Sequence, residues 1–391
     1  MDPACPLVVT GQQIGAGWSP ALSVAKALAA LAVARKLGGR ARYWLADEDH
    51  DRLEVASVVG LQGERLQRHR FEFAEAPGTA TGWLAWTERH QADAEKLWGP
   101  IPAPTEPTLR GHALALGEPL WRRGLEPFSP TDPALREPIQ EELLRWRSLD
   151  LDKGLAAQAE ALEKAGAPLP LDPRTQAAWF ALNPATGLRT RLDPGQALKP
   201  GRWLSPGAAL RPLMQSLLLP VTHAVLGPSE RAYWRLAEPL WERVGLAAPE
   251  LVPRPSVMVL PKGLALEPGQ LEELREGRWE AMAPRPGALP SSLLGHPMAD
   301  PAWGEALGER FRRELGRARA RLGRLDRRLL RDLAAASLGM DPERLRQRLF
   351  PFGAPQERVL PGVYWLRDEA LLDRMLEGLD GSQPLLLLEE S

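Results

Sequence analysis

The first fifty residues constrain the fold most, because they follow a strand–loop–helix–strand pattern. Residues 7–9 (LVV) are an apolar run typical of a buried strand, and residues 42–46 (RYWLA) predict a second strand. Between them, the alanine- and leucine-rich residues 20–37 predict a helix with Ser19 as its N-cap and Pro20 at its first position. This is a βαβ unit, which implies a parallel strand pair with a right-handed crossover.

The following residues predict a second α/β block. Further strands or strand-like pieces are expected at 55–61, 68–73, 179–182, 221–226 and 249–260, and helices at 132–165, 206–219 and 229–244. Residues 76–130 are rich in Pro and Trp and only weakly periodic, so we expect an irregular insertion there. The predicted fold class is therefore α/β.

A regular apolar pattern marks the C-terminal third. Six apolar residues recur at alternating steps of four and three: Phe311, Leu315, Ala318, Leu322, Leu325 and Leu329. This heptad seam predicts a coiled-coil hairpin or a dimerising helix. The surrounding arginines could contact RNA or phosphate, but acidic residues are interspersed, so a solvated helix face is favoured and nucleic acid is not an expected partner. Residues 385–388 predict a terminal buried strand.

Composition narrows the class of protein. A length of 391 residues suggests two or three structural units, and the net charge of −1 excludes a grossly basic nucleic-acid coat. The single cysteine, Cys5, cannot form an internal disulfide. No signal peptide is evident, and the apolar stretch 21–34 carries Lys26 and is too short for a bilayer, which needs ~20 residues. We expect a cytoplasmic protein without a membrane span.

The polar loop after the first strand is a candidate binding site. Its residues Thr10, Gly11, Gln12 and Gln13 lie between a predicted strand and a predicted helix. Glycine lets the backbone approach a ligand, and a helix N-terminus suits an anion. The loop matches neither a P-loop nor a dinucleotide fingerprint. An ordinary strand-to-helix turn is the alternative.

A second candidate is the run DEDHD at residues 47–51, directly after the second predicted strand. Four carboxylates in five residues repel one another, so an amine, a metal-bound nucleotide or another hydrogen-donating ligand would suit them. Ligands of open α/β sheets bind beyond the carboxyl ends of the strands, where this run lies. His50, between Asp49 and Asp51, could act as an acid or base. The alternative is a solvated acidic loop, and structural zinc is disfavoured because no cysteine lies near.

A third candidate follows the predicted strand at 221–226. Gly227 begins a turn into a helix, Ser229 is a candidate N-cap, and Glu230 lies in the first helical turn. Tyr233 could form a wall of a pocket, although core packing is the alternative for an aromatic residue at a helix. His223, in the preceding apolar run, is interpreted as a core residue.

Several segments together resemble one known family. The sequence contains VVTGQQ at 8–13, YWLADEDHD at 43–51 and GPSERAYW at 227–234, with LSP at 204–206, LRPLMQ at 210–215, VPRPS at 252–256 and QER at 356–358. In this order they resemble the BshC family, the cysteine ligases of bacillithiol biosynthesis. The chain departs from the family's pattern at WSPAL (18–22) and at LGPSE (226–230).

The resemblance implies a Rossmann-like core interrupted by connecting-peptide insertions, with a helical coiled-coil part that forms a homodimer. The implied division is a first half of the core (1–75), a partly helical connecting insertion (76–200), a second half of the core (201–260), a second insertion with coiled-coil helices (261–350), and a segment that packs back on the core (351–391). The implied activity joins cysteine to the amine of glucosaminyl-malate in the last step of bacillithiol synthesis. An amide does not form readily from a free carboxylate, so ATP or ADP with Mg²⁺ is the expected activating cosubstrate.

The resemblance also assigns roles. Thr10, Gly11 and Gln12 would hold phosphate or carboxylate groups, with Gln13 beside them. Asp49, His50 and Asp51 would orient the sugar amine or a metal-bound nucleotide, with His50 as the proton acceptor. Ser229, Glu230 and Tyr233 would line the opposite wall, after the turn at Gly227.

Two other functions stay open at this point. One is an enzyme that activates an amino acid or nucleotide for another acceptor. The other is a non-catalytic, nucleotide-binding adaptor that uses its basic helix to bind a partner. The intact DEDHD run favours chemistry over the adaptor.

Overall fold

The computed structural model describes residues 5–13, 15–62, 65–278, 282, 304–379 and 384–390. The chain divides into two compact units, residues 1–259 with 357–391 and residues 260–356. The five-part division that the resemblance implies stays a prediction.

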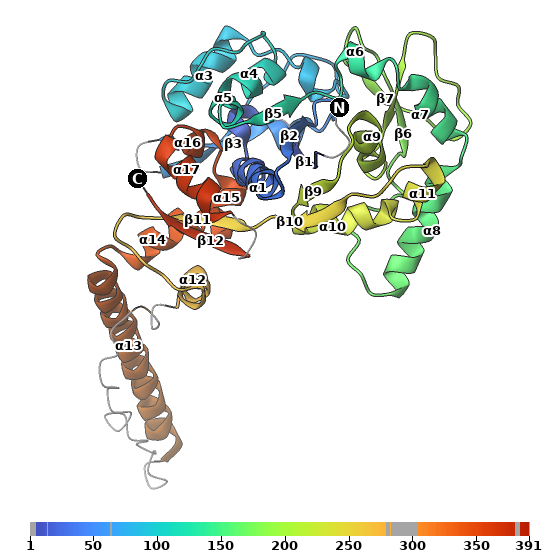
Figure 1. Cartoon of the computed structure of the whole chain (residues 1–391). Coiled ribbons are helices and arrows are strands. Elements are labelled where there is room, and N and C mark those ends of the chain that lie inside the picture. Colours follow the sequence, from blue (N-terminus) through green and yellow to red (C-terminus); the bar gives the residue numbers. More distant parts are fainter. Residues whose placement is uncertain are drawn as a thin grey trace. The chain divides into compact units, whose positions relative to one another are not determined.

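A five-stranded parallel sheet forms the centre of the larger unit, in the order β10-β9-β1-β2-β5 (Figure 1). Its strands are β1 (Leu7–Gln12), β2 (Arg40–Leu45), β5 (Leu125–Phe128), β9 (His223–Leu226) and β10 (Glu250–Pro253). β1 pairs with β2 in parallel, and α1 (Leu22–Leu37) joins them, which confirms the predicted βαβ unit. The chain adds strands on one side of β1 and later on the other, so the strand order reverses between β1 and β9.

The two faces of the sheet contact different cores, because side chains alternate along a strand. Val8 packs in a core with Leu28 and other residues of α1. Its neighbours Leu7 and Val9 pack in a second core with Met214. Among the helices that contribute to this second core are α7 (Gln140–Arg147), α8 (Leu151–Lys164), α9 (Arg211–Leu218) and α11 (Leu240–Val244). Helices on both faces confirm the α/β class, and burial on both sides explains why consecutive residues such as Leu7, Val8 and Val9 are all apolar.

The irregular insertion predicted for residues 76–130 was wrong. The segment contains α3 (Glu88–Trp98), α4 (Leu109–Leu116), α5 (Glu118–Trp121), the 3₁₀ turn at Thr81–Trp83 and the edge strand β5. These elements are short, and α4 buries His112 and Gly111 as well as its apolar residues, which obscures a helical hydrophobic period. β5 pairs with β2 despite Pro127, as an edge strand can.

Two helices begin at other residues than the sequence predicts. α1 begins at Leu22 with Ala21 as its N-cap, so Ser19 does not cap it, and a short 3₁₀ helix at Ala16–Trp18 precedes it. α10 (Pro228–Trp234) begins after Gly227 rather than at Ser229. There the side chain of Glu230 takes the capping role, because its Oε2 accepts a hydrogen bond from Gly227 N at 2.8 Å.

The other predicted elements form in shorter pieces. The helix expected at 132–165 is α6 (Pro133–Arg136), α7 and α8, and the one at 229–244 is α10, the 3₁₀ turn Arg235–Ala237 and α11. Residues 52–70 form α2 (Arg52–Ala56) and the antiparallel pair β3 (Ser57–Gln62) and β4 (Arg65–Arg70). A three-stranded sheet has the order β7-β6-β8, from Arg189–Arg191, Trp179–Leu182 and Trp203–Pro206.

After β10, Arg254 and Pro255 separate β11 (Ser256–Leu260) from the central sheet. β11 pairs with the C-terminal strand β12 (Leu385–Glu389), which confirms the terminal strand, although its leucines are only half-buried. Helices α15 (Gln356–Val359), α16 (Val363–Leu366) and α17 (Glu369–Gly378) lie between them in sequence, after the 3₁₀ turn Pro351–Gly353.

The smaller unit is helical in its described part. It contains α12 (Pro268–Arg275), the long α13 (Gly304–Leu338) and α14 (Pro342–Leu349) (Figure 1). The predicted seam lies on α13, where the exposed fractions of Leu322, Leu325 and Leu329 are 45%, 61% and 44%. A long helix is therefore confirmed, while the coiled-coil pairing and the dimer stay predictions.

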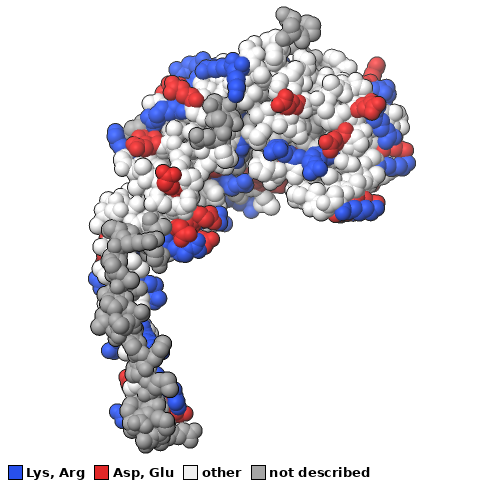
Figure 2. Space-filling view, turned by 60° about the horizontal axis from the view of Figure 1, so that its bottom comes forward, with Lys and Arg blue, Asp and Glu red and all other residues white. Residues whose placement is uncertain are grey.

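Charged side chains of both signs lie on the surface of the protein (Figure 2). Basic and acidic side chains are interspersed over the face that Figure 2 shows. Among the described helices, we find none with the length and apolar character needed to cross a membrane.

Candidate active site

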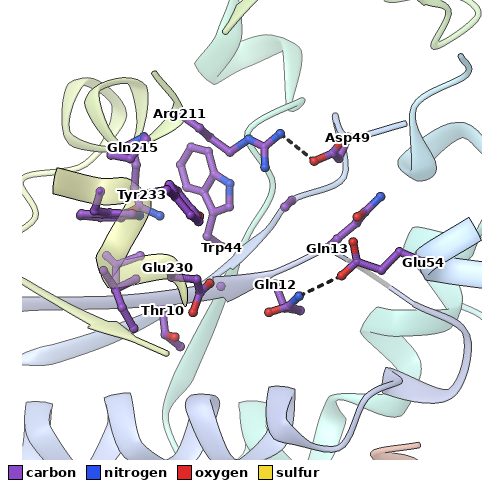
Figure 3. A pocket seen from close by; sticks show the side chains of 16 residues that line it. Thr10, Gln12, Gln13, Trp44, Asp49, Glu54, Arg211, Gln215, Glu230 and Tyr233 are labelled. Atoms are coloured by element: carbon purple, nitrogen blue, oxygen red, sulfur yellow. Dashed lines mark hydrogen bonds and ion pairs between the residues drawn. The ribbon is translucent and has the colours of Figure 1, made fainter. Parts of the chain in front are cut away.

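A pocket of about 230 Å³ lies beyond the carboxyl ends of β1, β2 and β9, where the strand order reverses (Figure 3). Its lining residues are Val9, Thr10, Gly11, Gln12, Gln13, Trp44, Ala46, Asp49, Glu54, Arg211, Pro212, Gln215, Leu226, Glu230, Tyr233 and Trp234. Open α/β sheets bind ligands at this position. The topology alone therefore makes this pocket the candidate active site.

Gly11 lets β1 approach β2 at the pocket floor. Gly11 is the register partner of Trp44, and a Cβ atom at Gly11 would lie 2.5 Å from the Trp44 carbonyl oxygen. No side chain fits in that space without a backbone shift. The glycine predicted as a ligand-approach residue thus has a second, purely structural reason to be there.

The structure brings most of the predicted site residues together. Seven line the pocket: Thr10, Gly11, Gln12, Gln13, Asp49, Glu230 and Tyr233. Four do not: His50, Asp51, Gly227 and Ser229. Three motifs far apart in sequence therefore meet at one edge of the sheet, while the roles predicted for their residues stay predictions.

Two arginines hold the carboxylate of Asp49. Arg211 Nη2 donates to Asp49 Oδ2 at 2.8 Å, and Arg189 Nη1 lies 3.6 Å from Asp49 Oδ1. Burial alone would raise the pKa of Asp49, but the Arg211 and Arg189 charges outweigh it and hold that pKa well below its usual range. Asp49 therefore stays ionised and fixes the Arg211 side chain at the pocket wall.

The first two acidic residues of the run are structural. Glu48 is fully buried, and its Oε2 accepts hydrogen bonds from Arg136 at 2.9 Å and Ser205 at 3.0 Å. Asp47 is also fully buried, and its Oδ2 accepts from Ser129 and Thr131. The acidic loop interpretation is thus wrong for these two residues, because folding places them inside the protein.

His50 has one ring nitrogen already in use. Arg189 Nη1 donates to His50 Nδ1 at 3.1 Å, so the neutral ring carries its hydrogen on Nε2. Burial, followed by the Arg189 charge, lowers the pKa of His50 from its ordinary value. This geometry favours a hydrogen-bond donor at Nε2 over the predicted proton acceptor.

Asp51 acts on the local backbone. Its side chain caps α2 by accepting from the Leu53 and Glu54 amides at 3.0 and 3.2 Å. Its carbonyl oxygen accepts from Gln13 Nε2 at 3.1 Å. Asp51 therefore positions two pocket residues, Glu54 and Gln13, from outside the pocket.

A buried lysine fixes the opposite wall. Lys26, on α1, is fully buried, and its ammonium group lies 2.6 Å from Glu230 Oε1 and 3.1 Å from Gln12 Oε1. Its third contact is the Gly11 carbonyl oxygen. Burial lowers the pKa of Lys26, while Glu230 opposes that shift. Lys26 thereby joins three pocket residues without lining the pocket itself.

The start of the first helix does not line the pocket, and the anion-binding role predicted for the loop before it stays a prediction. α1 begins at Leu22, and the Ala21 amide before it donates to the Leu360 carbonyl oxygen at 2.7 Å. None of the described residues of α1 lines the pocket. The Thr10 hydroxyl also donates elsewhere, to the Val225 carbonyl oxygen at 2.8 Å.

Sequence reasoning missed Arg211, Gln215, Glu54, Trp44 and Lys26 as individual site residues. Signals existed for some of them. Arg211 and Gln215 lie in the LRPLMQ segment, and Lys26 is a lone charge in an apolar stretch. Glu54 gave no signal, because α2 is too short to show a pattern.

The pocket does not offer an assembled metal or triphosphate site. Within the described ranges, no group of three or more His, Cys, Asp or Glu residues is placed to hold a metal ion. The pocket wall carries three carboxylates, on Asp49, Glu54 and Glu230, and the basic group of Arg211. Among the described lining residues, Arg211 is the basic one, so these residues do not form the cluster of cations that a nucleoside triphosphate requires.

Comparisons with known proteins agree with the motifs. Residues 195–255 match a family model described as "Bacillithiol biosynthesis BshC, N-terminal Rossmann-like domain". Proteins from two strains of Thermus thermophilus, provisionally named cysteine ligase BshC, are each 30% identical over 95% of this chain and 85% of their own length. A protein of the same name from Halalkalibacterium halodurans is 27% identical over 67% of this chain and 57% of its own.

Proposed function

Since this chain belongs to the BshC family and is a ligase of bacillithiol biosynthesis, we propose that it joins the carboxyl group of cysteine to the amine of glucosaminyl-malate, the last step of that pathway. The observation that carries the proposal is the meeting of three family-like motifs at one pocket. Separate segments of the chain line this one cavity, with residues 10–13, Asp49, Glu230 and Tyr233.

The chemistry of the pocket suits substrates with opposite charges at their two ends. Arg211 offers a guanidinium to a carboxylate, and the carboxylates of Glu54 and Glu230 face the same cavity (Figure 3). Both proposed substrates carry carboxylate and amino groups. Trp44, Tyr233 and Trp234 supply apolar surface on which a sugar or a thiol side chain can rest.

In this proposal, the pocket residues bind and orient the substrates, and they do not themselves activate the carboxyl group of cysteine. Asp49 holds Arg211 in place, and Lys26 holds Glu230, so two charged groups of the wall are preorganised. His50, beside Asp49, offers its Nε2–H as a hydrogen-bond donor. Adenine nucleotide with Mg²⁺ stays the proposed activating cosubstrate.

We also propose that the protein is a cytoplasmic homodimer. A homodimer through the α13 seam would cover the exposed leucines Leu322, Leu325 and Leu329. A cytoplasmic location suits a biosynthetic ligase with a free cysteine, Cys5.

A mass-spectrometric assay tests the function. The full-length protein is incubated with cysteine and glucosaminyl-malate, with and without ATP and Mg²⁺, and bacillithiol is quantified. We expect product that depends on the protein, and the nucleotide arms identify the energy source. The Arg211→Met variant should lower product at least tenfold. Absence of product in every arm would contradict the proposal and favour another acceptor.

A further inference from the structure

The pocket wall carries four ionised side chains, and three of them already pair with an opposite charge. Arg211 and Asp49 pair at 2.8 Å. Glu230 pairs with Lys26 at 2.6 Å and also accepts from the Gly227 amide. These pairs are internal to the protein, so Asp49 and Glu230 each already have a cationic partner, whereas Arg211 keeps further N–H donors for a ligand.

Glu54 differs from the other two carboxylates. No described Lys, Arg or His lies within 4.0 Å of its carboxyl group, and its contact at the pocket is a weak one, from Gln12 Nε2 at 3.4 Å (Figure 3). The residue is exposed at the pocket wall, so a ligand can reach it.

The surroundings of Glu54 disfavour its negative charge. Partial desolvation, and then the nearby carboxylates of Asp49 and Asp51, raise its pKa above the ordinary value. A cation beside Glu54 would relieve this repulsion. The Asp51 cap fixes the backbone of Glu54, and the long hydrogen bond from Gln12 leaves the carboxylate with acceptor sites for a ligand.

We propose that Glu54 receives the primary ammonium group of a substrate in this pocket. Arg211 would take the carboxylate of the same or the second substrate. The identity of the amine rests on the proposed function: it is the amino group of cysteine or the amino group of the amino sugar. An ammonium group supplies three charge-assisted donors, which suits a carboxylate with free acceptor sites.

Isothermal titration calorimetry on the full-length protein at neutral pH tests the proposal. Two pairs of ligands are compared: cysteine with N-acetylcysteine, and glucosaminyl-malate with its N-acetyl form. Acetylation removes the ammonium charge and keeps the rest of the ligand. The variants are Glu54→Gln, which is nearly isosteric, and Glu54→Lys. The matched control is Glu72→Gln, an exposed glutamate outside the pocket.

We expect the wild type and Glu72→Gln to bind the free amine of one pair at least about tenfold more tightly than its acetylated partner. The pair that shows the preference identifies the source of the amine. Glu54→Gln should bring the ratio close to one, and Glu54→Lys should reverse it.

Three results would overturn the inference: a preference that survives Glu54→Gln, equal binding of both members of both pairs by the wild type, or no detectable binding of either free amine. Failure of the proposed function is distinguishable. Amine binding that depends on Glu54 without bacillithiol formation would reject the ligase reaction and leave the binding site in place.

Discussion

Lys26 Nζ lies 2.6 Å from Glu230 Oε1, and the two residues are 204 positions apart in sequence. The lysine reaches from α1 to α10 and touches Gly11 and Gln12 on the way. One buried ammonium group thus connects the first motif of the pocket to the last.

Replacing this lysine should damage both stability and activity. Lys26→Met removes the cation and leaves Glu230 and the Gly11 carbonyl oxygen without their partner, which we expect to cost roughly 3 kcal/mol of the free energy of unfolding. Chemical denaturation measures the loss. Lys36→Met, on the exposed end of the same helix, is the matched control and should change little. Equal stability of the two variants would contradict a role for the buried pair.

The sequence predicted the site better than it predicted the pairs within it. Parallel strands place their carboxyl ends at one sheet edge, so TGQQ and DEDHD could be expected to meet. Nothing local specifies that Arg211 pairs with Asp49, 162 residues away, or that Lys26 pairs with Glu230. Such partners are set by tertiary folding, which also turned Asp47 and Glu48 from a predicted ligand loop into buried structural groups.

The close contact of β1 and β2 predicts a steric limit at the pocket floor. In Gly11→Ala, the added methyl group would lie 2.5 Å from the Trp44 carbonyl oxygen. We expect overpacking to lower stability by ~1–3 kcal/mol and to distort the pocket. Thermal unfolding checks the first effect and ligand titration the second. Gly269→Ala is the control, because its Cβ would meet no atom within 4 Å, and wild-type-like behaviour of both variants would refute the limit.

A second buried ion pair ties the two chain segments that flank the helical unit. Arg254 donates two hydrogen bonds to Glu357 at 2.9 and 3.0 Å, and Glu357 also accepts from the Val257 amide. Both side chains are 2% exposed. Glu357→Gln leaves the Arg254 charge unpaired, which should cost ~3–5 kcal/mol by urea denaturation.

Glu163→Gln is the control for this pair, because Glu163 and Arg174 are paired at 2.5 Å on the surface. Exposed pairs contribute little, so the control should unfold like the wild type. If both glutamate variants lost the same stability, burial would not be what makes the Arg254–Glu357 pair important.

The buried carboxyl group of Asp47 should make the free energy of unfolding depend on pH. Burial raises its pKa from 3.8 to about 6, with Ser129 and Thr131 hydrogen bonds opposing the shift. The folded state therefore holds the proton more tightly than the unfolded state. The stabilising contribution is present below pH 3.8 and is lost as pH rises through about 6. An asparagine cannot ionise, so Asp47→Asn should not lose stability in this way. As pH rises from 3.8 to about 6, the free energy of unfolding of the variant should therefore rise relative to that of the wild type. A difference independent of pH would contradict the shift.

His50 gives the sharpest test of a side-chain role in the reaction. Because Arg189 donates to Nδ1, His50 can offer a hydrogen at Nε2 but no free lone pair in its neutral form. His50→Gln supplies an amide N–H in a similar place and should keep activity within about tenfold of the wild type, whereas His50→Ala should lose more. General acid–base catalysis would instead predict a loss of ~10²–10⁴-fold in both variants. His223→Gln, at the amino end of β9, serves as the control and should leave the rate unchanged. Equal and large losses in both His50 variants would restore the proton-acceptor role and reject the donor role.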